Sequence, residues 1–200
     1  MERYNEILRH PVFLDHMKRL EALEEKRIYC KHGLDHLRDV CRLSYIVYLQ
    51  DRLAKNPTIE GVVFQNRSLM KDLLYGASLL HDVGRVEEYE GKGSHDVMSA
   101  LLAGEILPDC GYSMDETAMI QLSILGHRRS GTKKADEAQY QELFQKCEAL
   151  CNMKEKDLTV FLSYALKRAD HGSRECFHCL AYETCNWNEE RKNMGLDGGI

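Results

Sequence analysis

Apolar residues recur at intervals of three and four along most of this chain, rather than alternating with polar ones. Such spacing places apolar side chains on one face of a helix, whereas a half-buried strand needs a period of two. Only three prolines, at positions 11, 57 and 108, interrupt the pattern. The pattern therefore predicts an all-α fold, a compact bundle of helices.

Local signals predict where these helices begin. Pro11 suits the first turn of a helix, because its missing N–H group would have no partner there. Ser113 followed by Glu116 is a capping-box pattern, and Asp136 followed by Gln139 resembles it. The predicted helices begin at or just after Pro11, Leu34, Ser68, Ser94, Ser113, Asp136 and Asp157.

Length and composition set the domain organisation. A chain of 200 residues with 44% apolar content can build one hydrophobic core and is too short for two large domains. We expect one helical domain over residues 1–175. Residues 176–200 form a short cysteine-bearing extension, which we expect to pack on that domain rather than fold independently.

The net charge and the first residues of the chain limit the classes of binding partner that we expect. The net charge of −5 gives no general basic surface, which argues against binding of a nucleic-acid duplex and favours a small molecule. The segment 1–6 is charged and lacks an apolar signal core, and no apolar run is long enough to cross a membrane. These features predict a cytoplasmic protein with no membrane partner, and they leave its oligomeric state open.

Two aspartates and four histidines stand at the inward faces or ends of predicted helices. They occur in the order His36, His81, Asp82, His95, His127 and Asp170. A single histidine on an apolar face is more often a hydrogen-bonded core residue than a ligand. An aspartate buried without compensation is costly, however, so Asp82 and Asp170 at the ends of apolar runs indicate a cation between them.

Several short segments resemble the HD-domain superfamily of metal-dependent phosphohydrolases. The strongest is Leu79-Leu80-His81-Asp82-Val83-Gly84-Arg85. The others are His36-Leu37-Arg38-Asp39-Val40, Ser94-His95, Gly126-His127-Arg128 and Arg168-Ala169-Asp170. The resemblance covers roughly residues 28–175, and it implies an all-helical fold around a metal centre.

The resemblance also implies the ligand set. One metal ion is expected on His36, His81, Asp82 and Asp170, while His95 and His127 match the subset of the superfamily that holds a second ion. His32 and His36, four residues apart, both could supply the first ligand. We choose His36, because a valine follows it four residues later, and leave His32 as a substrate-binding residue, a support for the ligands or a residue without a role.

Two ions bridged by Asp82 would suit hydrolysis of a small phosphate ester or nucleotide, with His81 and Asp82 at the catalytic centre. Mixed histidine and carboxylate ligands favour Fe, Mn, Co, Ni or Zn. Arg85 and Arg128, which adjoin the ligands, and Lys92 are candidates for binding phosphate. For the basic loop that Arg128 begins, a solvated surface is an equally good interpretation.

Eight cysteines without a secretory signal predict free thiols or metal ligands rather than disulfides. Cys176, Cys179 and Cys185 form a CxxC pair with a third thiol nearby. They could bind a structural Zn²⁺ with a fourth ligand from His171, His178 or Cys151. A redox pair, an iron–sulfur site and plain packing remain alternatives.

Two other functions fit the same ligand order. Diiron oxygenases of the superfamily use such a set to activate O₂ on small polar or phosphorylated substrates. A non-catalytic metal-binding regulatory module is the second alternative, although all six candidate ligands are present.

Overall fold

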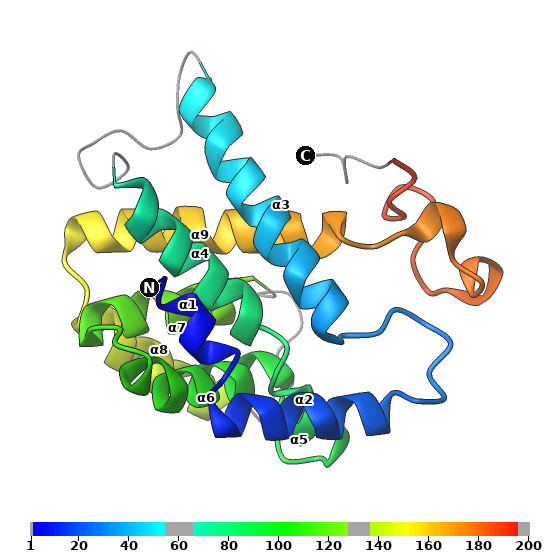
Figure 1. Ribbon diagram of the computed structural model, residues 1–200, viewed down its shortest axis with the longest axis horizontal. Helices are drawn as coiled ribbons and strands as arrows, with labels where there is room; N and C mark the ends of the chain where they lie inside the picture. The colour runs from blue at the N-terminus through cyan, green and yellow to red at the C-terminus, as the bar shows by residue number, and fades with distance from the viewer. Residues whose placement is uncertain (1, 55–65, 128–136, 196–200) are drawn as a thin grey trace.

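The computed structural model describes residues 2–54, 66–127 and 137–195. All regular secondary structure in these ranges is helical, so the predicted all-α fold is confirmed (Figure 1). The α-helices are α1 (Tyr4–Ile7), α2 (Pro11–Leu23), α3 (Leu34–Leu53), α4 (Arg67–Leu80), α5 (Arg85–Tyr89), α6 (His95–Asp109), α7 (Met114–Gly126), α8 (Glu137–Ala149) and α9 (Met153–Gly172), and the 3₁₀ helices η3 (Cys176–His178) and η4 (Tyr182–Thr184) follow.

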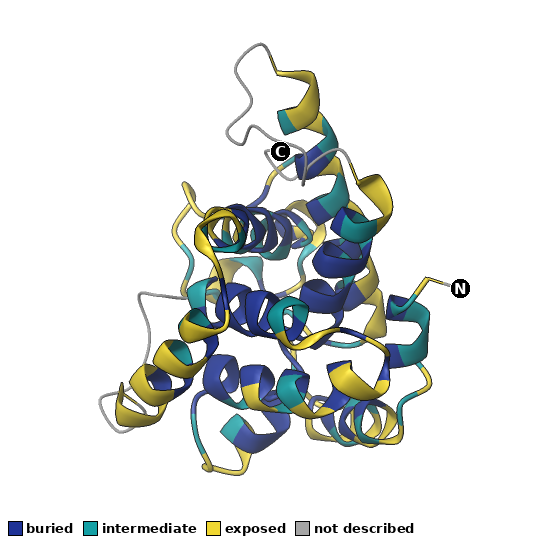
Figure 2. Ribbon diagram, turned by 90° about the vertical axis from the view of Figure 1, so that its left-hand side faces the viewer, coloured by how far each residue is buried: buried dark blue, intermediate teal, exposed yellow. Residues whose placement is uncertain are grey.

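Helices α3, α4, α7 and α9 form the centre of the bundle. α9 packs along both α3 and α7, α4 contacts all three of the others, and α6 lies along α7. Figure 2 shows the result as buried inner faces and exposed outer faces on the same helices. The largest fully buried side chains include Tyr48 of α3, Leu80 of α4 and Phe161 of α9. A continuous apolar core therefore fixes the ends of the central helices relative to one another.

The capping residues explain where the helices begin, and two predicted starts were wrong. The capping box of Ser113 and Glu116 is confirmed at α7. α4 is capped by the side chain of Asn66 and not by Ser68. α9 begins four residues before Asp157, because Asn152 and Glu155 form an earlier capping box. Asp136, the predicted start of α8, lies outside the described residues.

The segment after α9 is tied to the end of that helix. The side-chain amide of Asn193 donates hydrogen bonds to the carbonyls of Gly172 and Arg174, at 2.9 and 2.8 Å. The Trp187 ring stacks on the His171 ring with centroids 5.1 Å apart. Figure 1 shows this tail at the same end of the molecule as the connection between α2 and α3.

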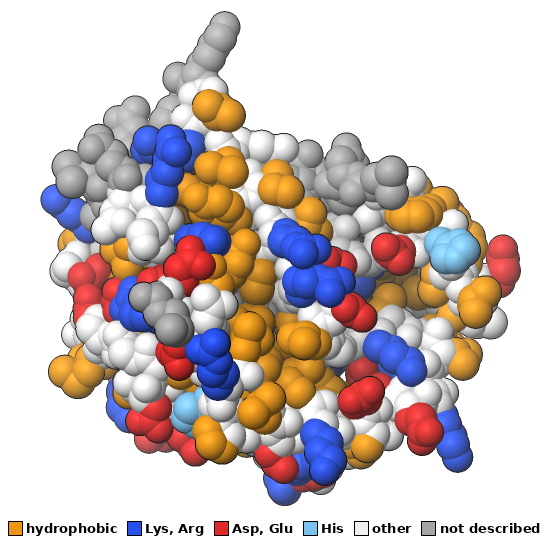
Figure 3. Space-filling view, in the orientation of Figure 1, with side chains coloured by type: hydrophobic (Ala, Val, Ile, Leu, Met, Phe, Trp, Pro, Cys, Tyr) orange, Lys and Arg blue, Asp and Glu red, His pale blue; other side chains and the backbone are white. Residues whose placement is uncertain are grey.

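The exterior carries charges of both signs. On the face seen in Figure 3, lysines and arginines are interspersed with aspartates and glutamates around scattered apolar side chains. Among the described residues, no helix combines the length and the apolar character needed to cross a membrane.

Arg3 links the start of the chain to two central helices. Its guanidinium reaches Asp72 of α4 at 3.0 Å and both carboxylate oxygens of Glu116 in α7, at 2.5 and 3.0 Å. Burial alone would raise the pKa of Glu116, but the hydrogen bonds from Arg3 and from the Ser113 backbone lower it. The ionised form of Glu116 is therefore favoured by folding.

We expect Glu116→Gln to lower the free energy of unfolding by about 1 kcal/mol at pH 7. Glutamine retains the capping box but loses the charge that pairs with Arg3. Because the pKa of Glu116 is lowered on folding, its contribution is present above the ordinary value of 4.5 and is lost as the pH falls below it. Urea unfolding at pH 7 and pH 3 should show the deficit only at pH 7.

Glu105→Gln, at an exposed position of α6, is the control. An equal loss of unfolding free energy at both pH values in Glu116→Gln would contradict the ion-pair interpretation.

Candidate metal centre

The candidate ligands come from the ends of five elements. His81 and His127 directly follow the last residues of α4 and α7, while His95 is the first residue of α6. His36 lies in the first turn of α3, and Asp170 lies in the last turn of α9. These helix ends converge because the helices share one core, so residues up to 134 positions apart in the chain meet at one point.

Gly84 allows the closest approach in this region. A Cβ atom at this position would lie 2.3 Å from the Ser99 backbone nitrogen and 2.7 Å from the His95 carbonyl oxygen. The Gly84 N–H also donates to the Ser99 hydroxyl at 2.9 Å. Any larger residue would push the turn after His81-Asp82 away from α6. The glycine thus brings Asp82 and His95 within reach of one ion.

The first group of candidate ligands is His36, His81, Asp82 and Asp170. One ligand atom from each lies within 4.8 Å of every other. His36 Nε2 is 3.4 Å from Asp82 Oδ2 and 3.4 Å from Asp170 Oδ1. His81 Nε2 lies 3.2 Å and 3.7 Å from the same two oxygens. Two imidazoles therefore face two carboxylates around a common centre.

The second group shares a carboxylate with the first. Asp82, His95 and His127 also place ligand atoms within 4.8 Å of one another. His95 Nε2 lies 3.6 Å from Asp82 Oδ1, the oxygen that does not face His36. The His127 ring lies between those of His81 and His95, with centroid distances of 5.4 and 6.0 Å. One oxygen of Asp82 can thus serve each group, as in a bridging carboxylate.

The four imidazoles are oriented by bonds at the opposite nitrogen. At the ends of α4 and α7, His81 and His127 each donate from Nδ1 to the carbonyl three residues earlier, which the helix leaves without a partner. Nδ1 of His36 bonds to the Ser173 hydroxyl at 3.0 Å, and Nδ1 of His95 bonds to Glu88 at 3.2 Å. Bonds of this kind leave Nε2 as the atom that can bind a metal ion.

Polar atoms without partners support the same interpretation. Among the described residues, Nε2 of His81, His95 and His127 and Oδ2 of Asp82 are buried and have no hydrogen-bond partner. Buried polar atoms are nearly always satisfied, so four orphans facing one centre need an explanation. A metal ion would satisfy them, and the residues present fit such a group.

Burial and charge set the protonation states. Burial alone would raise the pKa of Asp82, but Arg85 and the adjacent histidines hold it well below its usual range. Burial opposes a charge on His81, yet the Asp82 and Asp170 carboxylates raise its pKa to about 9. Burial lowers the pKa of His127 to about 4. The site therefore attracts positive charge at its carboxylates and keeps His127 in the neutral form that binds metals.

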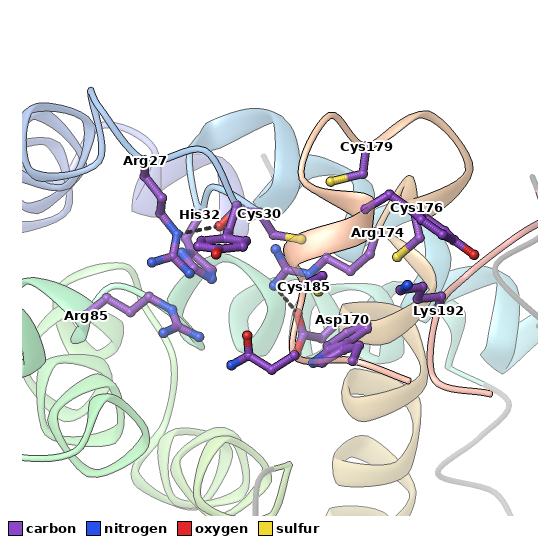
Figure 4. Close-up of a pocket in the computed structure, with 14 residues that line it drawn as sticks. Arg27, Cys30, His32, Arg85, Asp170, Arg174, Cys176, Cys179, Cys185 and Lys192 are labelled. Carbon is purple, nitrogen blue, oxygen red and sulfur yellow. Dashed lines mark hydrogen bonds and ion pairs between the residues drawn. The ribbon is translucent and has the colours of Figure 1, made fainter. Parts of the chain in front are cut away.

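A cavity of about 380 Å³ opens beside these ligands (Figure 4). Asp170 lines it together with four cationic residues, Arg27, Arg85, Arg174 and Lys192. Figure 4 shows Arg85 and His32 at one end of the cavity and Cys176, Cys179 and Lys192 at the other. Four cationic side chains thus line the wall next to the candidate metal centre, and each is paired with a carboxylate at 2.7–3.8 Å.

The structure brings together two of the four predicted substrate-binding residues. Arg85 lines the cavity and donates from Nε to Asp82 Oδ1 at 2.8 Å, and His32 lines it as well. Lys92 is exposed and pairs with Glu90 at 2.6 Å, so it does not join them. Arg128 lies outside the described residues.

His32 forms a pair with Glu24 that the sequence analysis missed. Its Nδ1 contacts Glu24 Oε1 at 2.5 Å, and its backbone N–H donates to Oε2 at 2.7 Å. The Tyr89 hydroxyl donates to the same carboxylate at 2.6 Å. His32 Nε2 then lies 4.0 Å from Asp82 Oδ2. Burial lowers the pKa of His32 to about 4, so the imidazole is neutral at pH 7 and its Nε2 can accept a proton.

Arg174 is a second residue that sequence patterns did not single out beyond its charge. Its guanidinium donates to Asp170 Oδ1 at 2.7 Å and approaches His36 Nε2 at 3.2 Å. The only signal was its position four residues after Asp170, on the same side of a helix end. The contact with His36, 138 positions away, has no local pattern.

The three tail cysteines lie near a fourth cysteine, Cys30, which the sequence analysis did not include. Cys176, Cys179 and Cys185 line the cavity of Figure 4 together with Cys30, and all four are free thiols. Of the fourth ligands considered from the sequence, Cys151 is part of the hydrophobic core, and His171 stacks on Trp187, which lines the same cavity. His178 is exposed and lines an adjoining cavity together with Cys30, Cys176 and Cys179, so it lies near three of the four thiols.

The chain is 28% identical over 196 residues to a protein of Clostridium beijerinckii that is described as uncharacterized. This match covers 98% of the chain and 99% of the relative. No protein-family model matches the chain, and no solved structure matches it.

At the histidine–aspartate cluster we expect two divalent transition-metal ions in the wild-type protein, one in His127→Ala and none in Asp82→Ala, because Asp82 belongs to both ligand groups. At 100 times its Kd, one ion would stabilise the fold by about 2.7 kcal/mol. Elemental analysis and thermal unfolding with added Mn²⁺ or Zn²⁺ measure both effects.

Asp72→Asn is the matched control, since Asp72 is a buried carboxylate on α4 outside both ligand groups. Equal metal content in Asp82→Ala and Asp72→Asn would show that the histidine–aspartate cluster holds no ion.

Proposed function

We propose that this protein is a metal-dependent phosphohydrolase of the HD-domain type, with two transition-metal ions at the histidine–aspartate cluster. One observation carries the proposal: four imidazoles turn Nε2 toward two carboxylates, and Asp82 is common to both ligand groups. Bound there, two ions would acidify a water molecule and neutralise charge on a phosphoryl group.

The cationic wall of the cavity supports an anionic substrate. Arg85 and Arg174 each contact a ligand carboxylate and each line the cavity, so they can hold phosphate oxygens next to the cluster. Lys192 and Arg27 extend the positive charge away from it. A cavity of about 380 Å³ suits a small phosphate ester or a nucleotide, and Tyr29, Tyr182 and Trp187 offer aromatic surface for the remainder of such a molecule.

His32 is placed to move a proton. Glu24 fixes the tautomer with the proton on Nδ1, Nε2 lies 4.0 Å from Asp82 Oδ2, and His32 lines the cavity. The imidazole is neutral at pH 7, so Nε2 is available to accept a hydrogen bond from water, and because its pKa is about 4, a proton taken up there would be held weakly and passed on readily to a leaving group. This role extends the initial interpretation of His32 as a substrate-binding residue.

We expect metal-loaded wild-type protein to release phosphate from at least one small phosphate monoester or nucleotide and Asp82→Ala to release none above background. Asp72→Asn should retain full turnover, since it lies outside the cluster. A panel of mono- and dinucleotides and sugar phosphates, each tested with Mn²⁺, Fe²⁺, Co²⁺, Ni²⁺ and Zn²⁺, provides the measurement.

An oxygen electrode run in parallel separates the competing chemistry. Substrate-dependent O₂ uptake by iron-loaded protein, with no phosphate release on any substrate, would sink the hydrolase proposal. Loss of turnover in Asp72→Asn equal to that in Asp82→Ala would also contradict it.

For His32→Ala we expect kcat to fall by roughly 10²- to 10⁴-fold, with metal content and KM unchanged, because the proton carrier is removed while the ligands remain. Added imidazole should restore part of the rate. Glu24→Gln should lower kcat less, since the amide oxygen can still accept from Nδ1.

His16→Ala is the matched control. His16 is a buried histidine whose Nε2 lies 3.1 Å from Glu87, so it repeats the histidine–glutamate pairing away from the cavity. An undiminished kcat in His32→Ala would restrict His32 to a packing role.

A further inference from the structure

Four cysteines from two distant parts of the chain share one wall of the cavity. Cys30 precedes α3, whereas Cys176, Cys179 and Cys185 follow α9. Figure 4 shows all four around the side chain of Arg174. The other four cysteines, at positions 41, 110, 147 and 151, are buried in the helical core. The distribution thus separates core thiols from a cluster at the cavity.

The folded chain holds these two segments together independently of the thiols. The Tyr29 hydroxyl donates to the Thr184 carbonyl at 3.4 Å, and Arg174 donates to the Lys31 carbonyl at 3.3 Å. Asn193 and Trp187 fasten the tail to the end of α9. The cysteines therefore meet in a fixed arrangement and not through a loose tail.

Three cationic side chains lie near the four thiols, whereas burial disfavours the thiolate form of Cys176. Arg27, Arg174 and Lys192 line the same cavity, and nearby cations stabilise the deprotonated thiol that binds metals. Burial raises the pKa of the Cys176 thiol, and the neighbouring Cys30, Cys179 and Cys185 would add to the rise if they were charged. Four thiolates in one place need a metal cation to offset their mutual repulsion, and the three basic residues would balance the remaining negative charge.

We propose that Cys30, Cys176, Cys179 and Cys185 together bind a thiolate-preferring metal centre. Two centres have this chemistry, a tetrahedral Zn²⁺ and an iron–sulfur cluster. Zinc thiolates place sulfur atoms roughly 3.8 Å apart, from a Zn–S distance of about 2.3 Å. Among the described residues, neither group with ligand atoms within 4.8 Å of one another contains a cysteine, so a zinc ion would have to draw the four thiols closer together than they lie here.

This metal centre would stabilise the part of the cavity wall that lies next to the histidine–aspartate cluster. Cys30 lies two residues before His32, and Cys176 lies two residues after Arg174. A metal ion joining them would fix both side chains relative to Asp170. The role is structural, and it holds whichever reaction the histidine–aspartate site performs.

The test is metal and sulfide analysis of the full-length protein purified without oxygen or chelator. We expect either about four iron and four sulfide per chain, with visible absorption, or one thiolate-bound zinc, beyond the ions of the histidine–aspartate site. Cys179→Ser and Cys185→Ser, at half-buried positions, should lose this centre. Cys110→Ser and His178→Ala should retain it, and circular dichroism checks that each variant is folded.

Asp82→Ala separates this proposal from the proposed function, because it should lose the histidine–aspartate ions and retain the thiolate-bound metal. Two results would overturn the proposal. One is the same metal and sulfide content in Cys179→Ser and Cys185→Ser as in Cys110→Ser. The other result concerns protein prepared free of metal and without oxygen. Its four thiols would react with an alkylating reagent equally fast before and after the addition of zinc, or of iron together with sulfide.

Discussion

The carboxylate of Asp82 is the group around which this structure is arranged. Only 1% of the residue is exposed, and an ion removed from water so completely costs several kcal/mol unless other charges surround it. Arg85, His36, His81 and His95 supply that surrounding charge or polarity, and they come from four different helices or helix ends. The relative positions of α3, α4, α5 and α6 are therefore constrained by one buried side chain. The same constraint favours metal binding, since a divalent ion places more positive charge beside the carboxylate than the imidazoles do.

The histidines that follow α4 and α7 each have two roles, one at the helix end and one in the ligand cluster. The last carbonyls of α4 and α7 lack partners within their helices, and the histidine that follows each helix donates Nδ1 to one of them. That bond completes the helix end and also turns Nε2 toward the carboxylates. Gly84 contributes in a different way, because the absence of a side chain lets the turn after Asp82 press against the first turn of α6. The geometry of the ligands thus follows from ordinary requirements of backbone hydrogen bonding and packing.

Much of the cavity wall is formed by two segments outside the helical bundle, the one before α3 and the one after α9. The connection before α3 carries His32 and Cys30, and the segment after α9 carries Arg174 and the tail cysteines. Each segment has few apolar residues of its own to bury, so hydrogen bonds and ring stacking hold it in place. A metal centre at the cysteines would add rigidity where the hydrophobic core does not reach. The bundle therefore supplies the candidate ligands, and the flanking segments supply most of the side chains that line the cavity beside them.

The sequence by itself determined the helical class, the Ser113 capping box and the six candidate ligands, because spacing of three and four and short caps are local properties. It misplaced the start of α9, where Asn152 with Glu155 forms an earlier cap than Asp157. Only the tertiary structure decided that Glu24 orients His32, that Arg174 reaches His36 and that Cys30 joins the tail cysteines. The last two depend on contacts between residues more than 130 positions apart. No periodicity or motif encodes such a contact, since it arises from the way α3 and α9 pack on a shared core.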